Sequence, residues 1–184
     1  LTEAHPALDI AVEETVTRDV EARLMAHSLD IALVATPAYD ARIRARLLGQ
    51  DNFVLYHNLP PPDFQAIADA LPDMQHLPWH RLWLLQDVHC FRGQVLGFCA
   101  AQGLAAPPRT RYEAGSIATL VQLVDQLKGF TFLPALAVPT LHPPQQARVL
   151  TLGANAPSRP LYLLSLHTYP RQRLLDVIAS TVPV

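Results

Sequence analysis

Residues 116–134 read SIATLVQLVDQLKGFTFLP, and this stretch decides the fold class. Ser116 is a good N-cap, and the apolar residues after it recur at helical spacing, which predicts an amphipathic helix over residues 117–127. Gly129 is a good C-cap for that helix, and residues 130–134 form an apolar run that ends at a proline, as a strand does. A helix that leads directly into an apolar strand is typical of α/β proteins.

The alternation of strands and helices continues on both sides of this stretch. It predicts an α/β fold with parallel sheets and right-handed crossovers. Long loops at residues 60–62 and 142–146 indicate two α/β lobes, between which the chain crosses and later returns. The other strands are expected at residues 8–13, 29–35, 41–48, 52–56, 81–85, 110–113, 148–152 and 161–166. The other helices are expected at residues 18–27, 63–71, 89–102 and 172–182.

Composition and charge exclude several classes of protein. The chain has 184 residues, of which 50% are hydrophobic and 16% charged, so it can bury a core and is not disordered throughout. The net charge is −2 and no basic run occurs, which argues against nucleic-acid binding by this stretch alone. No apolar run approaches the roughly 20 residues of a membrane span, and no signal peptide is visible. The chain opens on LTEAHP without an initiator methionine, so we expect a fragment whose earlier elements are missing.

Both cysteines lie in residues 87–99, which read DVHCFRGQVLGFC. Cys90 is expected where a strand turns into a helix, and the positive end of a helix dipole favours the thiolate form of a cysteine in the first turn. His89 and Arg92 add hydrogen-bond donors and positive charge beside it. An activated thiol nucleophile needs these surroundings, whereas a structural cysteine does not.

The spacing of Cys90 and Cys99 excludes a disulfide within an intact helix. Nine helical steps of about 1.5 Å put the two Cα atoms roughly 13.5 Å apart, and on opposite faces. A disulfide needs Cα atoms about 4.4–6.8 Å apart, so the pair either never bonds or bonds only when the helix melts. Gly93 and Gly97 each cost the helix about 1 kcal/mol relative to alanine, so they leave it poorly protected against melting.

Other interpretations of these residues stay open. The two cysteines can be small buried hydrophobic residues, form a structural disulfide, or bind a metal together with His76, His80 and His89. Helix geometry opposes the disulfide, and the metal site lacks any CxxC or HExxH spacing. We therefore expect neither a metal nor a cofactor.

Several stretches resemble the LysR-type transcriptional regulators. Residues 89–94 (HCFRGQ) and 97–99 (GFC) are similar to the redox loop of the peroxide-sensing, OxyR-type members of that family. Residues 116–120 (SIATL) and 129–138 (GFTFLPALAV) are similar to a segment shared by many LysR-type effector domains. Residues 6–32 resemble a strand, helix and strand of the first lobe, so that the resemblance covers nearly the whole chain.

The resemblance implies two Rossmann-like lobes joined by hinge strands, as in periplasmic binding proteins. Lobe one would comprise residues 1–48 and 163–184 without its first strand and helix, and lobe two residues 49–162 with the redox segment at residues 89–99. A winged helix-turn-helix domain absent from this chain would bind DNA. The full protein would be a cytoplasmic transcription activator, a homodimer or tetramer that contacts RNA polymerase and no membrane.

The resemblance also gives roles to single residues. Cys90 would be the peroxide-reactive cysteine and Cys99 the resolving one. The residues that would bind peroxide or polarise the reactive thiol are His89, Arg92, Thr17 and Arg159. Two positions depart from the family pattern, which has a glycine at the first and often an acid at the second, and both bear on reactivity: Val88 and Gly93.

The sequence thus leads to one main hypothesis and two alternatives. In the main hypothesis, hydrogen peroxide oxidises Cys90 to sulfenic acid, a disulfide with Cys99 follows, and the remodelled domain and dimer switch DNA binding. The chain is then a sensor and not an enzyme. The first alternative is a LysR-type domain that binds a small organic effector between its lobes and has non-redox cysteines. The second is a thiol peroxidase.

Overall fold

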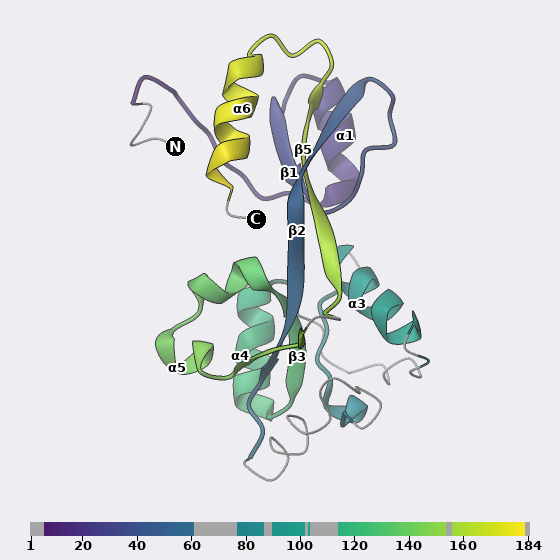
Figure 1. The fold of residues 1–184 in the computed structure, drawn as a ribbon, viewed down its shortest axis with the longest axis vertical. Helices are drawn as coiled ribbons and strands as arrows, with labels where there is room; N and C mark the ends of the chain where they lie inside the picture. Colours follow the sequence, from purple (N-terminus) through teal and green to yellow (C-terminus); the bar gives the residue numbers. More distant parts are fainter. Residues whose placement is uncertain are drawn as a thin grey trace. The chain divides into compact units, whose positions relative to one another are not determined.

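The structure is a computed structural model, and it describes residues 6–60, 77–86, 90–101, 103, 114–153 and 156–182. The chain forms two compact units, the first of Leu1–Gln50 with Pro160–Val184 and the second of Asp51–Arg159. Strands β2 (Ile43–His57) and β5 (Ser158–Leu166) each pass from one unit into the other (Figure 1). These units divide after residues 50 and 159, whereas the sequence placed the lobe borders after residues 48 and 162.

The first unit is built on β1 (Ile31–Val34), β5 and the first part of β2. Strand β1 pairs with β5 in antiparallel fashion, with Ile31 opposite Ser165. Helix α1 (Thr17–Met25) lies against these strands. Its buried residues share one apolar cluster with strand residues: Val20, Leu24, Ala32, Val34, Ile43 and Leu164.

Helix α6 (Gln172–Thr181) covers the other face of the same strands. Arg46 of β2 forms an ion pair with Asp176 of α6 at 2.5 Å. Because side chains alternate along a strand, Arg46 points away from the face on which Ile43 meets α1. The strands of the first unit therefore lie between two helices.

The second unit has a small antiparallel sheet. Strand β3 (Phe130–Pro134) pairs with the second part of β2, with Leu55 opposite Phe132. Strand β4 (Val149–Thr151) pairs with β2 over Val54–Tyr56, with Leu55 opposite Leu150. Two short helices, η3 (Ala135–Thr140) and α5 (Pro143–Gln146), connect β3 to β4.

Helices α3 (Cys90–Ala101) and α4 (Ile117–Leu127) cover opposite faces of this sheet. The ring of Phe91 in α3 packs on the ring of Phe53 in β2, with centroids 4.8 Å apart. The hydroxyl of Tyr56 in β2 donates a hydrogen bond to Asp125 of α4. Phe53 and Tyr56 are three residues apart, so they point to opposite faces of the strand. In the part of the chain that the structure describes, no helix is long and apolar enough to cross a bilayer.

The stretch that decided the fold class is confirmed. Helix α4 begins after Ser116, whose hydroxyl accepts a hydrogen bond from the backbone N–H of Thr119 at 3.1 Å. Strand β3 follows it and is buried at every position. Within a few residues, the structure also confirms the expected helices α1, α3 and α6 and the expected strands β1, β4 and β5.

The prediction of parallel sheets is wrong for the strand pairs that have a register, all of which are antiparallel. Among the described residues, parallel pairing occurs as two isolated bridges, Leu82–Phe130 and Leu85–Ala114. The strand expected at residues 81–85 is reduced to these bridges, after a 3-10 turn, η2 (Trp79–Arg81). An apolar run indicates that a strand is buried, but it does not indicate the direction of the neighbouring strand. The sequence therefore did not distinguish parallel from antiparallel pairing.

Three further predictions are wrong. Residues 8–13 form no strand. Their apolar side chains are not packed into a core, and Val12 is 89% exposed. The strands expected at residues 41–48 and 52–56 are one continuous strand, β2. The C-cap of α4 is Lys128, at φ 55°, and not Gly129. The elements expected at residues 63–71 and 110–113 lie outside the described residues.

Close packing, and not helix capping, requires a glycine at position 129. A Cβ atom there would lie 2.5 Å from the carbonyl oxygen of Arg81 and 2.5 Å from Nε1 of Trp83. Because a backbone oxygen has little room to move, we expect Gly129→Ala to lower the free energy of unfolding by about 1–3 kcal/mol. Urea denaturation measures this change.

Gly97→Ala is the matched control. A Cβ at Gly97 meets nothing within 4 Å, and the residue lies inside α3. We expect this change to raise the free energy of unfolding by about 1 kcal/mol. If both alanine variants were stabilised alike, the close contact at position 129 would be refuted.

Candidate functional site

Helix α3 carries both cysteines. Cys90 is its first residue and is partly exposed, whereas Cys99 is 1% exposed. Both are free thiols, and the helix runs without a break from Cys90 to Ala101. The expected helix is therefore intact, and it separates the two Cα atoms by about 13.5 Å along its axis.

The two thiols lie in different electrostatic surroundings. Burial raises the pKa of Cys99 to about 11, so this thiol stays protonated at neutral pH. Cys90 is instead the first residue of α3 and is partly exposed. An oxidant from solvent can thus reach the thiol of Cys90, whereas the thiol of Cys99 is shielded from solvent.

Arg92 fastens the first turn of α3 to the segment before it. Its Nη1 donates a hydrogen bond of 2.8 Å to the carbonyl oxygen of Leu85. Leu85 in turn forms a bridge with Ala114, close to the start of α4. Arg92, a predicted site residue, lies two positions after Cys90. Its hydrogen bond therefore connects the first turn of α3, which contains Cys90, to the segment that ends at Leu85.

Arg159, at the border of the second unit, contacts the residue after Cys90. Its Cζ lies 5.2 Å from the ring centroid of Phe91. Its Nε and Nη2 both donate to Oδ2 of Asp51, at 3.0 and 2.9 Å. The side chain of Asp51 is fully buried, and its Oδ1 accepts a hydrogen bond of 3.1 Å from the backbone N–H of Leu136. A buried carboxylate thus fixes the guanidinium against the ring that follows Cys90.

Thr17 and His89 are the remaining predicted site residues. Thr17 is the first residue of α1, in the first unit. It lines a cavity of about 250 Å³ whose walls come from that unit alone, among them Glu21, Thr36 and Tyr39. His89 lies outside the described residues.

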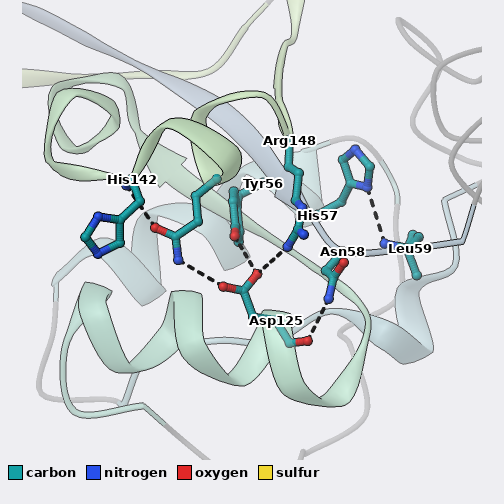
Figure 2. Close-up of polar contacts among 8 residues, drawn as sticks. Tyr56, His57, Asn58, Leu59, Asp125, His142 and Arg148 are labelled. Carbon is teal, nitrogen blue, oxygen red and sulfur yellow. Dashed lines mark hydrogen bonds and ion pairs between the residues drawn. The ribbon is translucent and has the colours of Figure 1, made fainter.

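A second polar cluster of the second unit joins α4 to the sheet (Figure 2). The carboxylate of Asp125 accepts hydrogen bonds from the Tyr56 hydroxyl at 2.6 Å, from Gln145 at 2.9 Å and from Arg148 at 3.0 Å. The backbone carbonyl of Asp125 accepts another from Asn58 at 2.6 Å. Burial, and then the hydrogen bond to Asp125, raise the pKa of Tyr56, so its hydroxyl remains a donor. Asp125 is thus held by three side chains, which indicates a structural role.

His57 lies beside this cluster and is 7% exposed. Its Nδ1 accepts a hydrogen bond of 3.4 Å from the backbone N–H of Leu59, which requires that this nitrogen carry no proton. Burial, and then the positive charge of Arg148, lower the pKa of His57. The ring is therefore a neutral part of the core.

Sequence reasoning did not select Asp51 or Asp125. Asp51 is the single acid of β2 and Asp125 is the single acid of α4, and this was the only signal in the sequence. It does not identify the partner, because Arg159 follows Asp51 by 108 positions. Among the described residues, no group of three or more His, Cys, Asp or Glu side chains could hold a metal ion, and His76 and His89 lie outside them.

The sequence profile of the LysR substrate binding domain matches residues 1–182. The chain belongs to the LysR substrate-binding domain family. The hydrogen peroxide-inducible genes activator of Dickeya chrysanthemi is 33% identical to this LysR-type domain over 141 residues, which cover 76% of the chain and 44% of the relative. The probable hydrogen peroxide-inducible genes activator of Mycobacterium avium is 34% identical over 89% of the chain and 51% of its own length. The HTH-type transcriptional regulator EstR of Acinetobacter baylyi is 30% identical over 97% of the chain and 58% of its own length.

The LysR-type domain spans about half the length of these relatives. Among solved structures, OxyR from Porphyromonas gingivalis aligns with a TM-score of 0.79 and 31% identity over 99% of this chain and 83% of that one. The reduced form of the OxyR regulatory domain from Pseudomonas aeruginosa aligns with a TM-score of 0.79 and 28% identity over 97% and 84%. These similarities confirm the expected fold class and the resemblance to OxyR-type regulatory domains.

The difference between the two thiols can be measured by alkylation. In the folded, reduced domain at neutral pH, we expect iodoacetamide to label Cys90 at least about a hundredfold faster than Cys99, because the thiolate is the reacting form and Cys99 is buried with a pKa of about 11. Mass spectrometry of timed samples gives both rates. In concentrated urea the two rates should converge, and similar rates in the folded domain would refute the asymmetry.

Proposed function

We propose that this chain is the peroxide-sensing regulatory domain of a LysR-type transcription factor, switched by oxidation of Cys90 and its bonding to Cys99. The observation that carries the proposal is a pair of free thiols on one intact helix, one at its partly exposed start and one buried. Relatives named as hydrogen peroxide-inducible activators, and similar structures of OxyR, support the same assignment.

The first chemical step takes place at Cys90. Its thiolate attacks one oxygen of hydrogen peroxide, the O–O bond breaks, and the other oxygen leaves as hydroxide, which takes up a proton to become water. The sulfur is thereby oxidised to sulfenic acid, and the peroxide is reduced. The helix start suits this step because it favours the anionic sulfur before the attack.

The second step joins the two cysteines. The thiol of Cys99 attacks the sulfenic sulfur of Cys90, the S–O bond breaks, and a second water leaves as the disulfide forms. In total, one peroxide and two thiols give one disulfide and two waters. The Cα atoms must come from about 13.5 Å to within about 6.8 Å, so α3 opens between the two residues.

The predicted site residues take the following roles in this proposal. Arg92, bonded to the carbonyl of Leu85, orders the first turn and, with His89, adds positive charge near the thiol. Arg159 lies against Phe91 and stabilises the position of that turn. A contribution of Thr17 to peroxide binding stays a prediction.

The output of the switch belongs to the full-length regulator. We assign DNA binding to a winged helix-turn-helix domain outside this chain, which spans about half the length of its relatives. Opening of α3 would change the interface of a homodimer or tetramer, and through it the arrangement of the DNA-binding domains and the contact with RNA polymerase. The disulfide would be transient in a reducing cytoplasm.

The cavity of the first unit favours a second candidate function, the binding of a small organic effector with both cysteines inert. Its volume of about 250 Å³ and its mixed wall, with Thr17, Thr36 and Tyr39 beside apolar residues, suit a small polar molecule. The similarity to the HTH-type transcriptional regulator EstR, whose name mentions no peroxide, agrees with this candidate as well.

Stoichiometric peroxide separates these functions. We expect hydrogen peroxide, added in equal amount to the reduced chain, to remove both free thiols within seconds, as counted by a thiol reagent. Cys99→Ser should stop at sulfenic acid on Cys90, which dimedone traps. Cys90→Ser should leave Cys99 unmodified, because it is buried and protonated.

Other outcomes would contradict the proposal. Thiols that survive peroxide, in a chain whose melting temperature rises with a small organic molecule, would establish the second candidate. Continuous consumption of peroxide in the presence of a reductant would indicate a thiol peroxidase.

The proposal also predicts that a more stable α3 resists oxidation. Cβ atoms at Gly93 and Gly97 meet nothing within 4 Å, so alanine fits at both positions. The double change should stabilise the reduced helix by about 2 kcal/mol. We therefore expect the equilibrium constant for disulfide formation in a glutathione buffer to fall roughly thirtyfold. An unchanged constant, with α3 more protected against hydrogen exchange, would show that the disulfide does not require the helix to open.

A further inference from the structure

Asp51 has no part in the chemistry proposed above, yet its side chain is fully buried. Both of its oxygens are engaged: Oδ2 accepts from Nε and Nη2 of Arg159, and Oδ1 accepts from the backbone N–H of Leu136. With both oxygens bonded, the carboxylate cannot turn, and Arg159 is held in one orientation.

That orientation places a flat cation on the first turn of α3. The guanidinium of Arg159 lies 5.2 Å from the ring centroid of Phe91, within the range of a cation–π contact. The ring is also packed against Phe53 at 4.8 Å, and Phe91 is only 5% exposed. Phe91 is therefore held between an aromatic ring and an arginine, and it directly follows Cys90 in the chain.

We propose that Asp51 is a positioning residue which, through Arg159 and Phe91, holds the first turn of α3 in its helical form and so sets the redox potential of the cysteine pair. This inference rests on the proposed disulfide between Cys90 and Cys99. The bond requires the helix between them to open, and a turn held by Phe91 opposes that opening. The contact stabilises the dithiol form, which raises the reduction potential of the pair.

The ion pair with Asp51 is what keeps Arg159 in contact with Phe91. Arg159 is 16% exposed, so a guanidinium without Asp51 could turn toward solvent and leave the ring. Removing one partner of a buried ion pair also leaves the other charge uncompensated. The loss of Asp51 should therefore release Arg159 from Phe91 and not merely weaken one hydrogen bond.

The test is a redox titration of the full chain carrying Asp51→Asn, which keeps the shape of the side chain and removes its charge. The reaction is the two-electron, two-proton reduction of the disulfide to two thiols, equilibrated in glutathione buffers and read by alkylation. We expect the constant for oxidation to rise about tenfold, which equals a shift of the potential by about 30 mV toward more negative values. Arg159→Lys keeps the positive charge but loses the flat guanidinium, and it should shift the constant in the same direction.

Hydrogen exchange supplies a readout that needs no disulfide. In the reduced Asp51→Asn variant we expect the amides of α3 to exchange about tenfold faster, with those of α4 unchanged. Asp125→Asn is the matched control, because it also removes a carboxylate bonded to an arginine, on the opposite face of the sheet from α3. It should lower overall stability and leave the redox constant as in the wild type.

The outcomes separate this inference from the function on which it rests. A wild-type chain that forms no disulfide in any glutathione buffer would contradict the proposed function. A folded Asp51→Asn variant with the wild-type redox constant and wild-type exchange in α3 would overturn the positioning role alone. Should Asp51→Asn fail to fold, Arg159→Lys and Phe91→Leu give the same two readouts, and wild-type values in both would overturn the positioning role.

Discussion

An α-helix advances about 1.5 Å per residue, and this fixed rise is the constraint on which the proposed behaviour of the domain depends. Because Cys90 and Cys99 lie on one continuous helix, α3, the helix and a bond between the two sulfurs exclude each other. Burial of Phe91, Val95 and Cys99 stabilises the helical form, whereas two interior glycines weaken it. In the proposed function, this segment has two arrangements that differ by a small free energy, and oxidation of sulfur selects between them.

The surroundings of the two cysteines agree with the order of steps in the proposed function. Peroxide from solvent can meet Cys90 at the helix start, whereas Cys99 is buried and its pKa is raised to about 11. In the proposed function, Cys99 would therefore become a partner only after the helix has begun to open. The folded helix would keep this thiol unreactive until then.

Much of the fold could be predicted from local signals. Ser116 caps α4, the apolar residues of that helix have helical spacing, and the apolar run after it forms β3. The direction of strand pairing could not be predicted, because it depends on partners far along the chain that an apolar run does not identify. The strand predicted at residues 8–13 is absent although apolar and polar residues alternate there. Val12 is left exposed, so this alternation does not reflect a buried face.

In the candidate site, too, local features could be predicted from the sequence and contacts between distant residues could not. The cysteine spacing and the helix around it could be predicted from residues 87–99, since both depend on neighbours in sequence. The ion pair of Asp51 with Arg159 could not be predicted, because these residues are 108 positions apart and belong to two different strands, β2 and β5. The sequence predicted that Gly129 would cap α4. In the structure, Gly129 is needed because a side chain at this position would clash with its neighbours.

The sheet of the second unit is held by different forces on its two sides. On the α4 side, Asp125 joins helix and strands through hydrogen bonds, which tolerate little change in distance or angle (Figure 2). On the α3 side, the rings of Phe91 and Phe98 pack on those of Phe53 and Phe132, and Arg159 lies over the Phe91 ring, so apolar and cation–π contacts join helix and sheet. If the proposed switch operates, the α3 layer would be remodelled over many cycles of oxidation and reduction while the strands beneath it keep their partners.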